Sequence, residues 1–329
     1  MKFFKYLLII IAGAWIGYLL GPKPSPPKAE ALKEAIPVDL LALENQINIK
    51  EKNINGIRPD NEARIIWADS TKKQKTKIAF VYIHGFSASQ EEGDPLHTNI
   101  AKKYKANLYL ARLAGHGINL GDSTMKNVTS DDFIQSAEEA LAIGKKLGDE
   151  VVILATSFGG ALSLYLASKH PEIKAMAIYS PCIRIADSNA ELLDNHWGLA
   201  LARIVNGSEI RDFKPYNSKH ADYWCTHYHL NAVIAMQNIL TNLIQKETFQ
   251  KVKCPLFLGY WYKNEAIQDN VVSVAAMLEM FEQLGTPADK KQKMAFPEAD
   301  NHVIGSYVLS KDYQNVEKQT DLFLSNILK

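Results

Sequence analysis

A single serine stands between two apolar runs, and its surroundings are those of a catalytic nucleophile. Residues 151–154 are all β-branched or aliphatic, which predicts a buried strand, and residues 161–167 predict a helix. A serine in the sharp turn between such elements forms a nucleophile elbow, whose strain requires small residues two positions before and after it. Ala155 and Gly159 meet this requirement. On these residues alone Ser157 is equally well interpreted as an ordinary helix cap.

A serine hydroxyl becomes a useful nucleophile only when a base takes its proton and a third group orients that base. In a doubly wound sheet such groups lie on loops at the carboxyl ends of strands. Glu265 and Asp269 follow one predicted strand, and His302 follows the next. The order Ser157, Asp269, His302 is that of nucleophile, acid and base in this architecture. Glu265 lies nearer to its strand end than Asp269 and competes with it as the acid.

The elements that must position these residues alternate along the chain. Strands are predicted at residues 63–68, 78–83, 107–113, 151–154, 174–179, 255–262 and 292–296. Helices are predicted at residues 95–104, 130–147, 161–167, 271–284 and 311–328. Continuous apolar strands that alternate with helices predict an α/β fold with a doubly wound, mostly parallel sheet.

The alternation stops between residues 181 and 253. Helix-like runs at residues 191–205 and 222–244 predict a helical cap that is inserted into the sheet domain. We therefore expect four parts: an N-terminal anchor or signal segment, a Pro-rich linker with a wrapping segment, a discontinuous core, and the cap. Their bounds are residues 1–20, 21–55, 56–180 with 254–329, and 181–253.

The N-terminus has the pattern of an export signal. Lys2 and Lys5 precede an apolar run at residues 6–20, and a proline-rich stretch follows at residues 22–28. The run would span about 22 Å as a helix, which is short of the roughly 30 Å hydrocarbon core unless Phe3 and Phe4 are included. No small-x-small cleavage site follows the run. We expect an uncleaved membrane anchor with the body outside the cytoplasm; secretion after cleavage is the alternative.

Charge and cysteine content exclude several other classes. Lys and Arg number 37, Asp and Glu number 36, and no long run of one sign occurs, so we expect no nucleic-acid partner. The three cysteines, Cys182, Cys225 and Cys254, are too scattered for a disulfide framework, although one pair could form outside the cytoplasm. Residues 225–229 read Cys-Thr-His-Tyr-His, but the segment is predicted to be helical, so we expect packing within the cap rather than a metal site.

Five pieces of sequence occur in order, each at the end of a predicted strand. They are His84-Gly85-Phe86, Gly115-His116-Gly117, the elbow around Ser157, Asp269 before Val271-Val272, and Asn301-His302-Val303. In these pieces the chain resembles the α/β-hydrolase superfamily, in its bacterial carboxylesterase, monoacylglycerol lipase and lysophospholipase-like (serine aminopeptidase-like) branch. The resemblance extends from about Arg64 onward. It departs from the family at Ala155, where glycine is usual, and in the N-terminal anchor.

The resemblance implies the remaining parts of the site. An oxyanion hole would be formed by the backbone amides of Phe158, which follows the nucleophile, and Phe86. His84, Gly85 and Gly159 would support these loops, Gly85 by permitting close approach of the backbone. The family pattern of an aspartate before an apolar pair favours Asp269 over Glu265 as the acid.

We therefore expect a serine hydrolase that cleaves carboxylic esters without a cofactor or metal. Ser157 would attack the acyl carbonyl, His302 would move the proton, and Asp269 would orient His302. The apolar cap suggests substrates with an apolar acyl chain, such as monoacylglycerols, lysophospholipids or short to medium alkyl esters. A serine aminopeptidase or amidase is the alternative, since acidic residues of the cap could hold a free amine: Glu191, Asp194, Glu209 and Asp222. A non-catalytic, membrane-anchored binding module is the more remote alternative.

Overall fold

A seven-stranded sheet forms the centre of the molecule, in the order β1-β3-β2-β4-β5-β8-β11. The computed structural model describes residues 2–328, so Met1 and Lys329, the ends of the predicted segments 1–20 and 254–329, lie outside it. The strands are β1 (Arg64–Ile66), β2 (Thr76–Ile83), β3 (Asn107–Leu110), β4 (Gly148–Thr156), β5 (Ala175–Tyr179), β8 (Leu256–Tyr260) and β11 (Lys291–Ala295). β1 is antiparallel to β3, and the other pairs are parallel.

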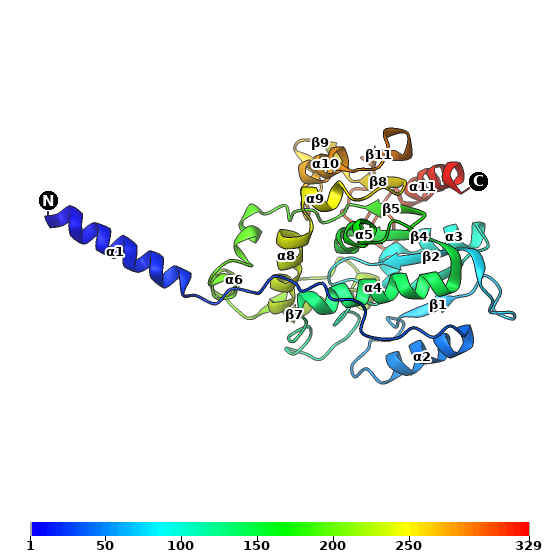
Figure 1. Ribbon diagram of the computed structural model, residues 1–329, viewed down its shortest axis with the longest axis horizontal. Helices are drawn as coiled ribbons and strands as arrows, with labels where there is room; N and C mark the ends of the chain where they lie inside the picture. The colour runs from blue at the N-terminus through cyan, green and yellow to red at the C-terminus, as the bar shows by residue number, and fades with distance from the viewer. Residues whose placement is uncertain (1, 329) are drawn as a thin grey trace.

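Helices cover both faces of this sheet (Figure 1). They are α3 (Leu96–Lys103), α4 (Ser130–Leu147), α5 (Ser157–Lys169), α10 (Val274–Gln283) and α11 (Tyr313–Ile327), with a short 3-10 turn η3 (Ala288–Lys290) before β11. Residues of β2 alternate between the two apolar layers: Val81 packs with α4 and α5, whereas Phe80 packs with α3 and α11. The predicted α/β class and the doubly wound, mostly parallel sheet are confirmed.

The N-terminal helix α1 (Lys2–Leu19) projects away from the body (Figure 1). Its 18 residues span about 27 Å, compared with a hydrocarbon core of about 30 Å. Among residues 2–328, no helix combines the length and the apolar character that crossing a membrane requires. The membrane anchor predicted for residues 1–20 is therefore not supported.

The segment after α1 wraps around the sheet domain. Residues 21–39 run along α4, where the Lys28 amide donates a hydrogen bond of 2.8 Å to Asp131. The chain then forms α2 (Leu40–Lys52), which packs beside β1. Glu51 of α2 makes a buried ion pair with Arg112, with distances of 2.6 Å from Nε to Oε2 and 2.9 Å from Nη2 to Oε1. This pair fastens the wrapping segment to the loop that follows β3.

The predicted cap, residues 181–253, contains a small sheet as well as helices. Its elements are the 3-10 turn η2 (Ser188–Leu192), α6 (Gly198–Asn206), β6 (Ile210–Asp212), α7 (Ser218–Tyr223), β7 (His227–His229), α8 (Asn231–Leu243) and α9 (Lys246–Phe249). The helix predicted for residues 222–244 is wrong over β7, which pairs antiparallel with β6. Cross-strand pairing has overridden the local helical pattern there.

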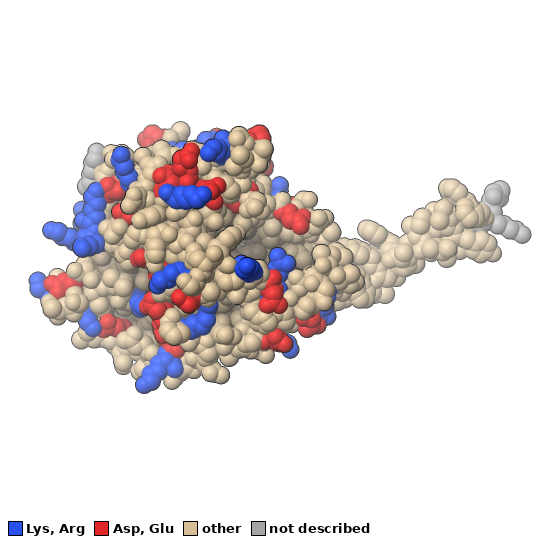
Figure 2. Space-filling model, turned by 180° about the vertical axis from the view of Figure 1, so that it is seen from behind, with Lys and Arg blue, Asp and Glu red and all other residues tan. Residues whose placement is uncertain are grey.

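The three potential metal ligands of residues 225–229 point to different partners. The Cys225 thiol donates to the Ile118 carbonyl at 3.5 Å, and His227 lies between Asp212 and Asp122 at 2.6 and 2.8 Å. His229 lies 3.2 Å from a carboxylate oxygen of Glu209. These contacts hold β7 against β6 and against the loop at residues 118–122. Charged side chains of both signs are interspersed over the face of the body shown in Figure 2.

Candidate active site

Ser157 lies where β4 ends and α5 begins, in the sheet's central region between β2 and β5. Its φ of 52° is in the left-handed region, which a serine adopts only under strain. Gly159 permits this turn, because a Cβ there would lie 2.1 Å from the Ile83 carbonyl oxygen. The Ser157 hydroxyl makes no hydrogen bond within the part of the chain that the structure describes. The residue therefore has the geometry of an elbow and not that of a helix cap.

Asp269 and His302 come together from the ends of neighbouring strands. Asp269 follows β8 and a small hairpin of β9 (Tyr262–Asn264) and β10 (Ile267–Gln268), and His302 follows β11. His302 Nδ1 lies 2.6 Å from Asp269 Oδ2, where its N–H donates to the carboxylate. The other carboxylate oxygen accepts from the amides of Val271 at 2.9 Å and Val272 at 3.1 Å. Both Asp269 oxygens are thus engaged, which fixes the direction of the imidazole.

The electrostatics of this pair follow from its burial and its partners. Burial by itself would raise the pKa of Asp269, but the His302 charge and the hydrogen bonds hold it below its usual value. Burial by itself would lower the pKa of His302, but the charges of Asp269 and Glu92 raise it. An ionised Asp269 can therefore stabilise a protonated His302. A base must be neutral, so a catalytic role of His302 as base predicts that activity is lost as the pH falls through its raised pKa.

Glu265, the competing acid, does not reach His302. Its carboxylate is exposed and accepts a hydrogen bond of 2.9 Å from the Tyr262 hydroxyl. The β9–β10 hairpin separates the two acids, because it extends the chain beyond the strand end before Asp269 turns back into the body.

The loop after β2 lies beside the elbow because β2 and β4 are neighbours, with Ile83 paired to Ala155. The amides of Phe86 and Phe158 donate no hydrogen bond to any other described residue. A Cβ on Gly85 would lie 2.9 Å from Ser157 Cβ, so only glycine allows this close approach. The two amides are thus available beside the nucleophile, as an oxyanion hole requires.

His84 ties this loop to the rest of the molecule. The side chain is fully buried; its Nδ1 donates to the Gly85 carbonyl at 2.8 Å, and its Nε2 accepts from the Leu113 amide at 3.1 Å. Burial lowers the pKa of His84 to about 4, so the imidazole is neutral. These contacts and the neutral imidazole are consistent with a supporting role of His84, which stays a prediction.

Ser157 and His302 open into one cavity of about 660 Å³ between the sheet domain and the cap. No hydrogen bond joins the Ser157 hydroxyl to His302 in this structure; in free enzymes such contacts are often long and shorten when substrate binds. Six aromatic residues contribute to the cavity wall: Phe86, Phe213, Tyr216, Trp224, Tyr228 and Trp261. Such a wall suits an apolar group.

Sequence reasoning missed one residue of this cavity, the buried Glu92 in the 3-10 turn η1 (Gln90–Gly93). Its carboxylate accepts from the Gly85 amide at 2.5 Å. No spacing pattern singled Glu92 out; the available signal was that an acid follows the His84-Gly85-Phe86 loop at short range.

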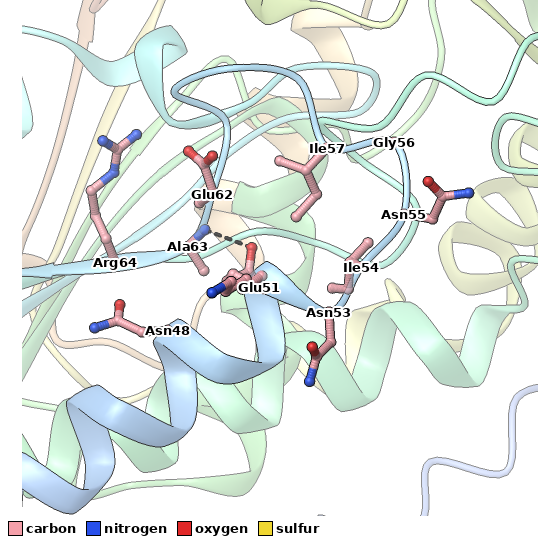
Figure 3. A pocket seen from close by; sticks show the side chains of 11 residues that line it. Asn48, Glu51, Asn53, Ile54, Asn55, Gly56, Ile57, Glu62, Ala63 and Arg64 are labelled. Carbon is pink, nitrogen blue, oxygen red and sulfur yellow. Dashed lines mark hydrogen bonds between the residues drawn. The ribbon is translucent and has the colours of Figure 1, made fainter.

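A second hollow of about 830 Å³ lies between α2 and the loop that leads to β1. Figure 3 shows its wall, in which Glu51 accepts a hydrogen bond from the Ala63 amide and Asn48, Asn53 and Asn55 extend around it. Its lining is polar and contains none of the predicted site residues. We therefore place the candidate site in the smaller cavity.

Several solved structures that are similar in fold to this chain are of lipolytic enzymes or esterases. A structure from work on LipS and LipT, two metagenome-derived lipolytic enzymes, has a TM-score of 0.66 at 17% identity and covers 82% of this chain and 99% of that one. The monoacylglycerol lipase of Paleococcus ferrophilus has a TM-score of 0.57 at 12% identity, covering 80% and 98%. The chain has the α/β-hydrolase fold. Est1E from Butyrivibrio proteoclasticus, with ferulic acid bound, shares this fold with a TM-score of 0.54 at 14% identity, covering 81% and 95%.

Sequence similarity to curated proteins is more local than this similarity of fold. A thermostable monoacylglycerol lipase from Bacillus sp. (strain H-257) is 33% identical over 96 residues, which are 29% of this chain and 37% of that lipase. The match thus spans little more than a third of the length of that relative. No family model matches the sequence.

Proposed function

We propose that this protein is a serine hydrolase that cleaves carboxylic esters. The observation that carries the proposal is that the strained Ser157 and the Asp269-bound His302 open into one cavity. Ser157 Oγ attacks the acyl carbon while His302 takes its proton, and His302 then protonates the leaving alcohol. The amides of Phe86 and Phe158 stabilise the oxyanion. Water, activated by His302, releases the acid from the acyl-enzyme, and no cofactor takes part.

The substrate that we propose is an ester with an apolar acyl chain, such as a monoacylglycerol, a lysophospholipid or a short to medium alkyl ester. The aromatic wall and the volume of about 660 Å³ support this, since a cavity of this kind buries an aliphatic chain well. The lipolytic proteins of the same fold support it by analogy.

The amidase alternative is less well supported, because the cap places no acid in the cavity. Of the four cap acids that could hold a free amine, Glu191, Asp194, Glu209 and Asp222, none lines it. The cap instead contributes two cations, Arg211 and Lys214. The acids that line the cavity, Glu92 and Asp300, come from the sheet domain, so the cap supplies no carboxylate there for a free amine.

A substrate panel tests this proposal. We expect hydrolysis of p-nitrophenyl esters, with kcat/KM rising with acyl length until the chain fills the cavity, and little release of naphthylamine from aminoacyl naphthylamides. The rates of both series are measured with the same enzyme at the same pH. A clear preference for the amides would contradict the esterase proposal and support the peptidase.

We also propose that residues 1–20 direct the catalytic body out of the cytoplasm. The two lysines before the apolar run support this, as does the exposure of the apolar side chains of α1. A fusion of the chain to alkaline phosphatase, which is active only after export, should give phosphatase activity. Equal activity from a fusion that lacks residues 2–20 would contradict the proposal.

A further inference from the structure

Glu92 is a buried carboxylate inside the candidate active site for which the proposed mechanism has no use. Its side chain is 2% exposed and lines the cavity together with Ser157 and His302. Oε2 accepts from the Gly85 amide at 2.5 Å and from the Tyr82 hydroxyl at 3.3 Å. Burial of a carboxylate is costly, so a partner such as the Gly85 amide is needed to hold it there. That amide belongs to the loop that carries Phe86.

The turn around Glu92 is held from several sides. Gly93 lets Tyr82 and His97 pack against the backbone, because a Cβ there would lie 2.4 Å from the Tyr82 ring and 2.5 Å from His97. The His97 imidazole also donates to the Gln90 carbonyl at 2.8 Å. These contacts hold the backbone on both sides of Glu92.

The same turn contacts the loop that carries His302. The Ser306 hydroxyl donates to the Glu91 carbonyl at 2.9 Å, and the Tyr307 amide donates to the Asp94 carbonyl at 3.1 Å. The turn η1 therefore contacts two loops of the site. Through Glu92 it contacts the loop of His84, Gly85 and Phe86 (the oxyanion loop), and through Glu91 and Asp94 it contacts the loop from His302 to Tyr307 (the histidine loop).

The charge of Glu92 acts on His302. Burial raises the pKa of Glu92 to about 7, against the opposing effects of the Gly85 amide and the His302 charge. The charged or titratable groups that act on His302 are Asp269 and Glu92, and those that act on Glu92 are His302 and Tyr82. His302 thus interacts with a second carboxylate besides the one that orients it.

We propose that Glu92 is a positioning residue of the active site. Its carboxylate holds the Gly85 amide, in the peptide unit directly before the one that carries the Phe86 amide, and so positions the loop that supplies the oxyanion donor. Because Glu92 and His302 line the same cavity, the ionised Glu92 carboxylate also stabilises the His302 imidazolium that forms when Ser157 attacks. This role rests on the proposed function of the site, and it extends that function by assigning a residue outside the serine, histidine and aspartate.

The variants E92Q and E91Q test this role as a matched pair. The glutamine oxygen in E92Q can still accept from Gly85, but the charge is lost. Loss of an anion lowers the pKa of His302, so we expect the acid limb of kcat/KM to move to lower pH by about half a unit or more. We expect kcat to fall about tenfold with KM within about twofold, because the imidazolium is less stable in the transition state.

E91Q makes the same chemical change one residue away. The Glu91 carboxylate accepts from the Tyr307 hydroxyl at 2.6 Å and does not contact the oxyanion loop. Its acid limb should coincide with that of the wild type. If E92Q showed the wild-type acid limb and the wild-type kcat, the role of Glu92 would be wrong.

A third variant and a folding control complete the test. E92L removes the acceptor as well as the charge, so its kcat should fall below that of E92Q. Rates are normalised to the fraction of enzyme that a fluorophosphonate titrates, so that misfolded protein does not count.

If E92Q does not fold, the variant Y82F replaces it. Loss of the Tyr82 hydroxyl, which donates to Glu92, disfavours the ionised Glu92, so the acid limb of kcat/KM should again move to lower pH. An unmoved limb in folded Y82F would then contradict the role.

The outcomes separate this inference from the proposed function. A wild type that hydrolyses no ester would contradict the function itself. An active wild type whose kcat and acid limb are matched by E92Q would contradict only the assignment of Glu92.

Discussion

Replacing Ser157 by alanine is expected to lower kcat/KM for ester hydrolysis by about 10⁴- to 10⁶-fold. The change removes the attacking oxygen, and only the catalysis supplied by binding and the oxyanion hole remains. Folding should be little affected, because alanine at a φ of 52° is as strained as serine and the hydroxyl has no hydrogen-bond partner among the described residues. The rates are measured on the best ester of the panel, and thermal unfolding of both proteins is compared.

Ser163→Ala is the matched control. Ser163 is a buried serine of the same helix whose hydroxyl donates to the Gly159 carbonyl at 2.7 Å, and it does not line the cavity. Its loss should cost about 1 kcal/mol of stability and leave kcat within about twofold. If S157A kept a tenth or more of the wild-type rate, Ser157 would not be the nucleophile.

Replacing Asp269 by asparagine is expected to lower kcat by about 10⁴-fold, the loss known for the equivalent change in another serine hydrolase. Asparagine is nearly isosteric, but it cannot stabilise the imidazolium, and its amide favours the wrong tautomer of His302. The acid limb should also move to lower pH, because Asp269 raises the pKa of His302. Steady-state rates across pH give both quantities.

Glu265→Gln is the control for the acid, because Glu265 was the competing candidate. Its carboxylate is exposed and bound to Tyr262, so the variant should keep nearly full activity. The assignment of the acid would be overturned if E265Q lost activity while D269N retained it.

Much of the fold and the core of the site could be predicted because their signals are local. Residues 151–157 show both the buried strand and the elbow, since a strand buried on both faces must be apolar throughout. The start of α4 was equally clear, and Thr129 and Asp132 form a reciprocal capping box there. The rule that such residues lie at strand ends indicated His302 but left Glu265 and Asp269 open, and only the resemblance to the family favoured Asp269.

The features that were missed depend on contacts between distant parts of the chain. β7 forms because β6, fifteen or more residues earlier, supplies a pairing edge, which no local pattern announces. Glu92 accepts a hydrogen bond from Tyr82 of β2, and Ser306 of the histidine loop donates to the carbonyl of the neighbouring Glu91. The position of Glu92 in the site therefore depends on contacts with two distant parts of the chain. The apolar run at the N-terminus is a strong local signal for a membrane helix. The helix that it forms, α1, projects from the body but lacks the combination of length and apolar character that crossing a membrane requires.

Covalent labelling by a fluorophosphonate tests the central claim most directly, because this reagent reacts with a serine only when the serine is activated. Intact-mass measurement followed by peptide mapping should show one adduct on the wild type, on the peptide that contains Ser157, and none on S157A. An adduct on another serine, or equal labelling of S157A, would contradict the assignment of the nucleophile. A folded wild type that gains no adduct would contradict the hydrolase proposal and support a non-catalytic binding module on the same fold.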